Sequence, residues 1–158
     1  MKYSRDVYRS RVLMVCFVAL LAVSGCAVQY VSRYDEITET SITEIQRSVE
    51  RLFQSIERSL GAPEAAYEHY ISTYEQLHVD AAMLSTRAQA IDLNSITAEQ
   101  SQLLMGWLSN LEELHKTGFT SGEMVAITRQ QGEQIFVAML KFELAKKREF
   151  DSAIIEEE

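Results

Sequence analysis

Apolar residues recur at steps of three and four along most of the chain, which is the spacing of one face of an α-helix. The first stripe contains Ile42, Ile45, Val49, Leu52, Phe53, Ile56 and Leu60. Charged residues such as Glu50 and Arg51 occupy the opposite face. Gly61 and Pro63 follow in the order that is typical of a helix C-terminus, so the pattern predicts an amphipathic helix that begins at Asp35 and ends before Gly61.

A second stripe begins after Pro63. It contains Tyr67, Tyr70, Tyr74, Leu77, Ala81, Leu84, Ala88 and Ile91. Its alternating steps of three and four residues are those of a heptad, which predicts a helix that packs at a shallow angle against its neighbours. Pro63 suits the first turn of this helix, because the N–H that proline lacks has no partner there.

Two further helices are expected after a break at residues 92–96. The third carries Leu103, Leu104, Trp107, Leu108, Leu111 and Leu114, and the fourth carries Val125, Ile135, Phe136, Met139, Leu140, Phe142 and Leu144. Residues 97–100 and 120–123 have the spacing of a capping box, so we expect the two helices to begin at Thr97 and Thr120. Gly118 is expected to end the third helix.

The fourth helix is expected to end near Lys146, Lys147 and Arg148, because cations stabilise the negative end of a helix dipole. The acidic tail, residues 151–158, is expected to be frayed. Residues 35–150 therefore predict an all-α domain. The short connections favour an up-down-up-down antiparallel four-helix bundle.

The N-terminus follows a different pattern. A basic segment with Lys2, Arg5, Arg9 and Arg11 precedes an unbroken apolar run over residues 12–23. As a helix this run would span roughly 18 Å, which is short of the roughly 30 Å of bilayer hydrocarbon. The run therefore predicts the apolar core of a cleaved signal-peptide helix rather than a membrane-spanning helix.

Small residues lead from this run into a cysteine, in the order Val23-Ser24-Gly25-Cys26. With this motif the chain resembles the bacterial lipoproteins, whose lipobox has the same pattern. The resemblance implies cleavage between Gly25 and Cys26, attachment of lipid to the Cys26 sulfur and a place in the bacterial cell envelope. Residues 1–25 would be the signal peptide, and residues 26–34 the lipidated cysteine with a tether. An ordinary signal peptide that ends near a cysteine and a short membrane anchor are the alternatives.

Ala27 follows the cysteine. In enterobacterial lipoproteins a residue other than Asp at this position accompanies export to the outer membrane, so the resemblance implies an outer-membrane protein that faces the periplasm. The inner membrane and the envelope of a single-membrane cell are alternatives. Residues 135–148 also resemble parts of small helical proteobacterial lipoproteins, a likeness that implies no activity.

Charge limits the partners of the mature chain. The leader holds four of the 15 basic and one of the 23 acidic residues, so cleavage leaves 11 basic and 22 acidic residues and a formal charge of −11. A nucleic-acid binder needs a basic face, so this class is excluded. An acidic body is also repelled from anionic lipid. If the first helix begins beside the membrane, the cations at 146–148 return to that side. They would face lipid head groups there or only complement the helix dipole.

One pattern raises the question of a metal. The Glu-x-x-His spacing of four-helix di-iron proteins occurs at Glu75 and His78 and at Glu112 and His115, with Glu50 and Glu143 available as further ligands. At about 100° per residue, however, Glu75 and Glu112 project to the solvent side of their helices. We therefore expect solvated acids beside boundary histidines, and no metal or other cofactor. The mature chain also lacks catalytic motifs, which argues against an enzyme.

The preferred hypothesis is a non-enzymatic scaffold or protein-interaction role, with the membrane bound through the N-terminal lipid and an envelope protein as partner. Phe119, in a connection far from the membrane, is the candidate contact, unless it folds back as a cap. The alternative is a carrier or sensor of a small apolar ligand. Its binding site in the bundle interior would be lined by Tyr67, Tyr70, Tyr74 and Trp107, unless these residues are ordinary core. Self-association through the second stripe is the third hypothesis.

Overall fold

The structure is a computed structural model that describes residues 31–156. Within this range it contains helices and no strand. The elements are α2 (Glu36–Ser59), η1 (Pro63–Ala65), η2 (Tyr67–His69), α3 (Ile71–Ala90), α4 (Ser95–Thr117) and α5 (Gly122–Glu156), of which η1 and η2 are short 3₁₀ helices. The predicted all-α fold with four α-helices is confirmed. The signal peptide, the cleavage site after Gly25 and the lipidation site at Cys26 lie outside the described residues.

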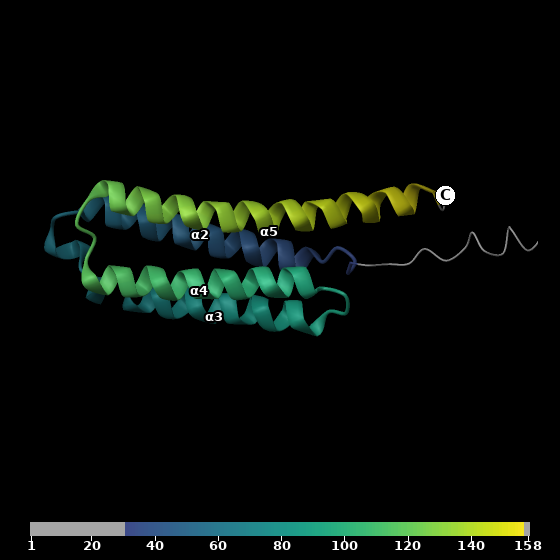
Figure 1. The fold of residues 1–158 in the computed structure, drawn as a ribbon, viewed down its shortest axis with the longest axis horizontal. Coiled ribbons are helices and arrows are strands. Elements are labelled where there is room, and N and C mark those ends of the chain that lie inside the picture. Colours follow the sequence, from purple (N-terminus) through teal and green to yellow (C-terminus); the bar gives the residue numbers. More distant parts are fainter. Residues whose placement is uncertain (1–30, 157–158) are drawn as a thin grey trace, which may run out of the picture. The chain divides into compact units, whose positions relative to one another are not determined.

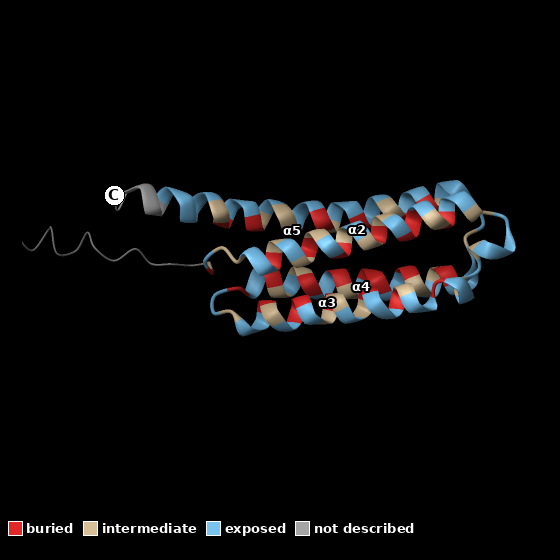
Figure 2. Ribbon diagram, turned by 180° about the vertical axis from the view of Figure 1, so that it is seen from behind, coloured by how far each residue is buried: buried red, intermediate tan, exposed pale blue. Residues whose placement is uncertain are grey.

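The four α-helices pack side by side around one apolar core (Figure 1). α3 packs along α4 and α2 packs along α5, and contacts of α2 with α3 and of α4 with α5 join the two pairs. Buried residues line the sides on which the helices face one another, whereas the outward sides are exposed (Figure 2). Among the helices of residues 31–156, none has an apolar stretch long enough to cross a bilayer.

The first two predicted stripes form much of this core. From Ile42 to Ile56 every residue of the first stripe is buried, and so is every residue of the second from Tyr70 to Ala88. Two leucines of the later stripes contradict the prediction, because Leu103 is 66% exposed and Leu144 is 44% exposed. In α4 the core-facing positions follow from Leu104 in steps of four and three, and Leu103 lies about 100° away from that line around the helix.

Capping explains where the helices begin. The Asp35 carboxylate accepts a hydrogen bond from the Thr38 N–H at 3.1 Å and so caps α2. The predicted capping boxes are both wrong. α4 begins at Ser95, so Thr97 lies inside its first turn. α5 begins at Gly122 and is capped by Ser121, whose hydroxyl accepts from the Met124 N–H at 3.2 Å. Gly118 ends α4 as predicted, with φ at +91°.

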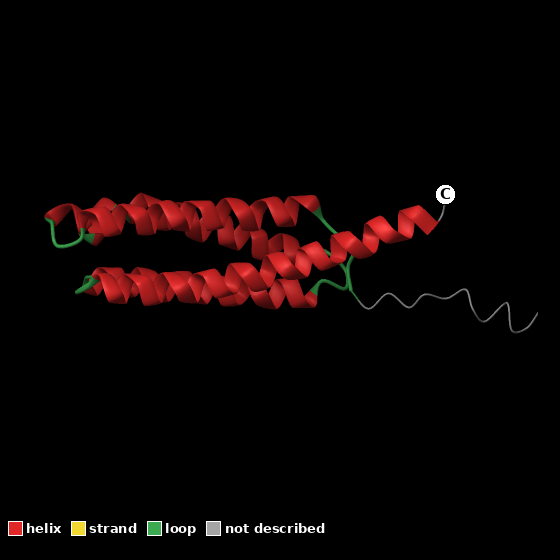
Figure 3. Cartoon of the chain, turned by 90° about the horizontal axis from the view of Figure 1, so that it is seen from above, coloured by secondary structure: helices red, strands yellow, loops and turns green. Residues whose placement is uncertain are grey.

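Two helix boundaries differ from the sequence pattern. Pro63 begins η1, and α3 begins only at Ile71, because the extended backbone of Ala66 interrupts the helix. α5 continues through residues 146–148 as far as Glu156, so neither its predicted end nor the predicted fraying from Asp151 is correct. Its last turns extend past the ends of the other helices (Figure 3). No glycine or proline follows Arg148 to stop the helix.

The bundle has two ends, which we name after Asn94 and Ala65. The Asn94 end holds Ser32, residues 91–97 and residues 143–147, which hydrogen bonds bring together. The Ala65 end holds residues 59–70 and the end of α4 from Glu112 to Phe119. The length of α3 separates them. Ser32, at the end of the predicted tether, is buried at the Asn94 end, where its N–H donates to the Leu93 carbonyl at 2.9 Å.

Candidate functional site

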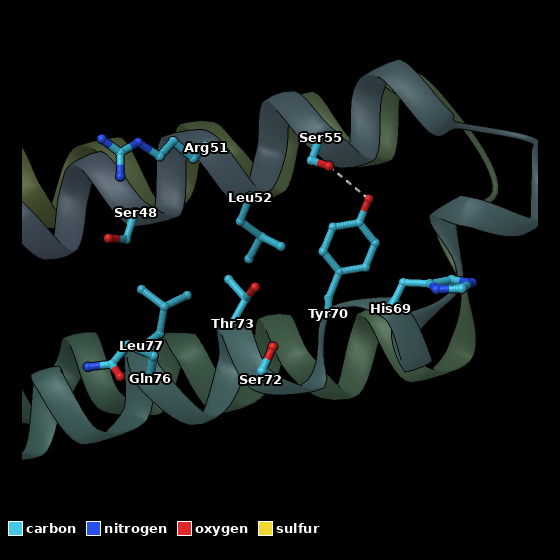
Figure 4. A pocket seen from close by; sticks show the side chains of 10 residues that line it. All are labelled: Ser48, Arg51, Leu52, Ser55, His69, Tyr70, Ser72, Thr73, Gln76 and Leu77. Carbon is cyan, nitrogen blue, oxygen red and sulfur yellow. Dashed lines mark hydrogen bonds between the residues drawn. The ribbon is translucent and has the colours of Figure 1, made fainter.

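An open pocket of about 520 Å³ lies between α2 and α3, near the Ala65 end. It is lined by Ser48, Arg51, Leu52, Ser55, His69, Tyr70, Ser72, Thr73, Gln76 and Leu77 (Figure 4). Leu52, Tyr70 and Leu77 belong to the buried core. The other lining residues are hydroxyl, amide, imidazole or guanidinium groups at the edges of the two helices. The pocket therefore combines hydrogen-bond donors and acceptors with a substantial apolar surface.

Arg51 supplies the permanent charge of this lining. Its side chain is exposed, and within residues 31–152 it forms no ion pair. Arg129 and Arg87 are paired, with Glu50 and Asp35, whereas other exposed arginines such as Arg47 resemble Arg51 in forming no ion pair within residues 31–152. An arginine guanidinium presents a fork of donors that fits a carboxylate or a phosphate. The pocket can therefore receive an anionic group from a partner or ligand.

Tyr70 connects the pocket to α2. Its hydroxyl lies 3.1 Å from the Ser55 hydroxyl and 3.3 Å from the Ser59 hydroxyl (Figure 4). Of the four residues expected to line a ligand cavity, Tyr70 lies in the pocket wall, whereas Tyr67, Tyr74 and Trp107 do not. The lining observed here is mixed, with polar side chains beside an apolar surface, whereas the sequence hypothesis expected an apolar cavity in the bundle interior.

Tyr74 and His115 form a buried pair beside the pocket. The Tyr74 hydroxyl lies 2.9 Å from His115 Nδ1, and His115 Nε2 lies 2.8 Å from the Ala65 carbonyl oxygen. Because a carbonyl only accepts, Nε2 carries the proton, and Nδ1 accepts from the Tyr74 hydroxyl. Burial lowers the pKa of His115, in agreement with a neutral ring, and raises the pKa of Tyr74. Both ring nitrogens are occupied by the protein itself, so the pair holds α3, α4 and η1 together.

Phe119 covers this pair. Its side chain is partly buried, and its ring centroid lies 5.2 Å from that of His115. The structure thus places Phe119 as the cap over the bundle end that the sequence hypothesis allowed, rather than as a freely exposed contact.

Glu112 lies at the edge of the same region. Its carboxylate accepts from the Tyr67 hydroxyl at 2.6 Å and lies 2.8 Å from His78 Nε2. Lys116 approaches to 3.1 Å. The Tyr67 hydroxyl, with His78 and Lys116, lowers the pKa of Glu112 to about 2 despite the opposing effect of burial.

These contacts correct two expectations. Glu112 is not a solvated acid, because its side chain is only 18% exposed, and His115 is not at the boundary, because it is 2% exposed. Only two of the four Glu-x-x-His residues meet, since His78 bonds to Glu112. Glu75 is exposed, and both ring nitrogens of His115 bond elsewhere. Within the part of the chain that the structure describes, no three histidine, cysteine, aspartate or glutamate side chains are grouped to hold a metal ion.

Trp107 packs in the core away from the pocket. Its ring centroid lies 6.3 Å from those of Phe53 and Phe136, and its ring lies against Gly132 of α5. A Cβ atom on Gly132 would be 2.4 Å from Trp107 Cζ2. The indole N–H is buried without an acceptor among the described residues. Trp107 therefore joins α4 to α5 in the core.

A buried ion pair lies at the Asn94 end. Lys146 Nζ is 2.8 Å from Glu143 Oε1, and their side chains are 3% and 0% exposed. Lys146 also donates to Asn94 Oδ1 at 2.7 Å and to the Thr97 hydroxyl at 3.0 Å. The expectation that Lys146 faces lipid head groups is therefore wrong, as is a role at the helix C-terminus, because α5 continues beyond it. Glu143 Oε2 has no partner among the described residues.

Sequence reasoning missed both the pocket and the ion pair. Ser48 and Ser55, seven residues apart on α2, face Thr73 and Gln76, three residues apart on α3 (Figure 4). This row of polar residues beside two consecutive apolar stripes was the available signal. Glu143 and Lys146 carried a weaker signal, an acid and a base one helical turn apart.

No protein-family model matches the chain, and no curated protein or solved structure matches it.

Proposed function

We propose that the chain is a lipoprotein of the bacterial cell envelope, anchored by lipid on Cys26, whose helical bundle binds another envelope protein without catalysing a reaction. The lipobox residues Val23 to Cys26 support the anchor, and Ala27 supports an outer-membrane site that faces the periplasm. The observation that carries the binding role is the open pocket between α2 and α3 with Arg51, which forms no ion pair within residues 31–152. The occupied ring nitrogens of His115 support a structural rather than a catalytic role for the one buried histidine of residues 31–156.

We further infer an up-down-up-down antiparallel arrangement of the four helices. Each helix contacts the next along the chain, and α2 also contacts α5. Short connections at residues 91–94 and 118–121 favour antiparallel neighbours. Bonds from Asn94 to Ser32 and to Lys146 support a shared end for the start of α2, the end of α3, the start of α4 and the later part of α5.

The partner that suits the pocket is a protein segment with an acidic side chain. Arg51 can form an ion pair with a carboxylate, and Ser48, Thr73 and Gln76 can bond to neighbouring polar groups. The pocket is open to solvent along two rigid helices, so a partner can reach it without opening the core. Rigid helices also lose little conformational entropy on binding.

A small ligand is the second candidate. The pocket volume of about 520 Å³ falls in the range of small-molecule sites, roughly 300–1,000 Å³. The mixed lining with Arg51 changes the expected ligand class from apolar to amphipathic with an anionic group. Tyr70 would contribute an aromatic wall, while the other three aromatic residues named in the sequence hypothesis lie elsewhere.

The test uses the full chain, expressed in its native bacterium and extracted from membranes after crosslinking. The variant Arg51→Glu reverses the charge in the pocket. Arg47→Glu is the matched control, because Arg47 is an exposed arginine of the same helix outside the pocket lining. We expect a protein that co-purifies with the wild type and with Arg47→Glu, and whose recovery falls strongly with Arg51→Glu.

The other outcomes separate the candidates. A partner recovered equally with all three chains would contradict binding at the pocket. If no protein co-purifies, native mass spectrometry should reveal a small bound mass that Arg51→Glu loses and Arg47→Glu keeps, which would favour the second candidate. Absence of both would overturn the binding role.

A further inference from the structure

Three exposed apolar side chains lie at the Asn94 end of the bundle. Leu93 is 56% exposed, Ile96 is 44% exposed and Ile37 is 56% exposed. Leu93 and Ile96 belong to the connection between α3 and α4 and the first turn of α4, and Ile37 belongs to the first turn of α2. An ion pair between Asp35 and Arg87 holds the start of α2 beside the end of α3. The three side chains are therefore held at the same end.

Leu93 has an unusual backbone. Its φ is +60°, and it is the one residue other than glycine with a positive φ among those the structure describes. Glycine or asparagine adopts this left-handed conformation with little strain, whereas a leucine does not. A strained backbone that presents an apolar side chain to water points to a use for that side chain.

The chain is attached to the bundle at this same end. Ser32 is 6% exposed, and it bonds through its N–H to the Leu93 carbonyl and through its hydroxyl to Asn94. Residues 27–31 alone separate Ser32 from Cys26. Fully extended, this segment reaches at most about 22 Å. A lipid on Cys26 therefore keeps the Asn94 end within that distance of the bilayer that holds it.

We propose that the Asn94 end is a membrane-docking surface on which Leu93, Ile96 and Ile37 enter the interface of the bilayer that holds the lipid anchor. This docking rests on the proposed lipidation of Cys26. Because the last turns of α5 extend past the Asn94 end, the docked bundle is tilted so that α5 lies beside the contact, with the Ala65 end and the α2–α3 pocket directed toward partners farther away (Figure 3). The chain has a formal net charge of −8, so anionic lipid repels it and charge attraction does not hold the sides of the bundle against the bilayer.

Apolar contact, rather than charge, carries this docking. Arg33 and Arg148 are exposed near the Asn94 end, but so are the acids Glu36, Asp92, Glu149 and Asp151. The charges of this end are therefore mixed. An apolar side chain gains free energy in the interface of a neutral bilayer as well, so neutral lipid is the appropriate probe.

The full precursor is expressed in bacteria, where it is processed and lipidated, and the mature protein is then purified. It is reconstituted in phosphatidylcholine vesicles, in which part of the phosphatidylcholine carries a spin label on its acyl chain. Ser95→Cys and, in a second protein, Thr120→Cys carry an environment-sensitive fluorophore; both residues are exposed, at the Asn94 end and next to the Ala65 end respectively. In the processed protein Cys16 has been removed and the Cys26 sulfur is blocked. We expect quenching by the labelled lipid at position 95 and none at position 120. Equal quenching at both positions, or none at either, would overturn the docking.

Two pairs of substitutions test the named side chains. Leu93→Asn with Ile96→Gln should lower quenching at position 95 to the level of position 120 while thermal stability is retained, because asparagine tolerates the left-handed backbone. Val79→Asn with Met83→Gln is the matched control, since these α3 residues are 53% and 67% exposed away from both ends. Full quenching in the first pair, or equal loss in both, would contradict the proposal. A wild-type protein that does not float with the vesicles would refute the lipid anchor itself, and the docking with it.

Discussion

Lys146 of α5 donates a hydrogen bond from Nζ to Asn94 Oδ1 at 2.7 Å, and so fixes the fourth helix to the connection between the second and third. The Ser32 hydroxyl donates to the same oxygen at 2.8 Å. One amide side chain thus joins the end of the predicted tether to the α3–α4 connection and to α5. Lys146 is 5% exposed and Glu143 is fully buried. Removing either charge would leave the other one buried without its partner, which lowers the stability of the folded protein.

The first prediction concerns this ion pair. Lys146→Met leaves Glu143 buried without its cation and should lower the free energy of unfolding by about 3–5 kcal/mol. Lys146→Met combined with Glu143→Leu removes both charges and should recover most of that loss. Urea denaturation of the two variants measures both effects. A double variant as unstable as the single one would show that the pair is not energetically coupled.

The second prediction uses two glycines in helix interiors. In Gly132→Ala the new Cβ would lie 2.4 Å from Trp107 Cζ2, so we expect a loss of about 1–3 kcal/mol and a shift in Trp107 fluorescence. Gly106 has no atom within 4 Å of its added Cβ. Gly106→Ala should therefore stabilise the protein by about 0.5–1 kcal/mol through helix propensity. Stabilisation by both substitutions would contradict the close contact between Gly132 and Trp107.

The third prediction concerns acid. The Arg87 guanidinium, helped by the Thr38 hydroxyl and N–H, lowers the pKa of Asp35 from 3.8 to about 2. The unfolded chain then binds a proton at higher pH than the folded chain. The contribution of Asp35 is therefore complete above pH 3.8 and is lost as the pH falls through about 2.

Asp35→Asn keeps an oxygen that can cap α2 but loses the charge. Near neutral pH it should be less stable than the wild type by about 1 kcal/mol, a value reduced because Arg87 is partly exposed. The difference should shrink between pH 3.8 and pH 2 in denaturation experiments. Glu36→Gln, a change at an exposed acid of the same helix turn, is the control. A difference that stays constant with pH would show that the Arg87 contact does not lower the Asp35 pKa.

The fourth prediction concerns His115. Burial lowers its pKa from 6.5, so the unfolded chain takes up the proton first as the pH falls below that value. The stability that His115 contributes is therefore largest above pH 6.5 and decreases below it. His115→Leu should be less stable at high pH, because the Tyr74 hydroxyl and the Ala65 carbonyl lose their partner, and the gap to the wild type should narrow on acidification. A gap that widens in acid would mean that the folded protein holds His115 protonated.

Sequence pattern predicted the parts of the fold that depend on helix periodicity. The stripes from Ile42 to Ile56 and from Tyr70 to Ala88 lie in the core because an unbroken series of apolar residues at steps of three and four leaves one choice of buried face. Gly61 and Gly118 end their helices because both adopt a positive φ, which glycine tolerates. Such features are local, so one segment at a time is enough to predict them.

Features that depend on two distant segments were not predictable in this way. Lys146 looks like a surface cation at the end of a helix until α5 is packed against Asn94 and Thr97. Glu112 looks solvated until the Tyr67 hydroxyl from η2 reaches it. The pocket requires the edges of α2 and α3 to face each other in one register, which neither stripe specifies alone. Candidate site residues chosen for being aromatic were therefore mostly core residues.

The central claim is that lipid on Cys26 holds the bundle to a bacterial membrane. Its most direct test is the intact mass of the protein extracted from membranes of the native organism, compared with that of Cys26→Ser. We expect the wild-type chain to begin at Cys26 and to carry the added mass of acyl groups. The Cys26→Ser chain should keep residues 1–25 and gain no such mass. A mature chain that begins at another residue, or one that begins at Cys26 without added mass, would contradict it.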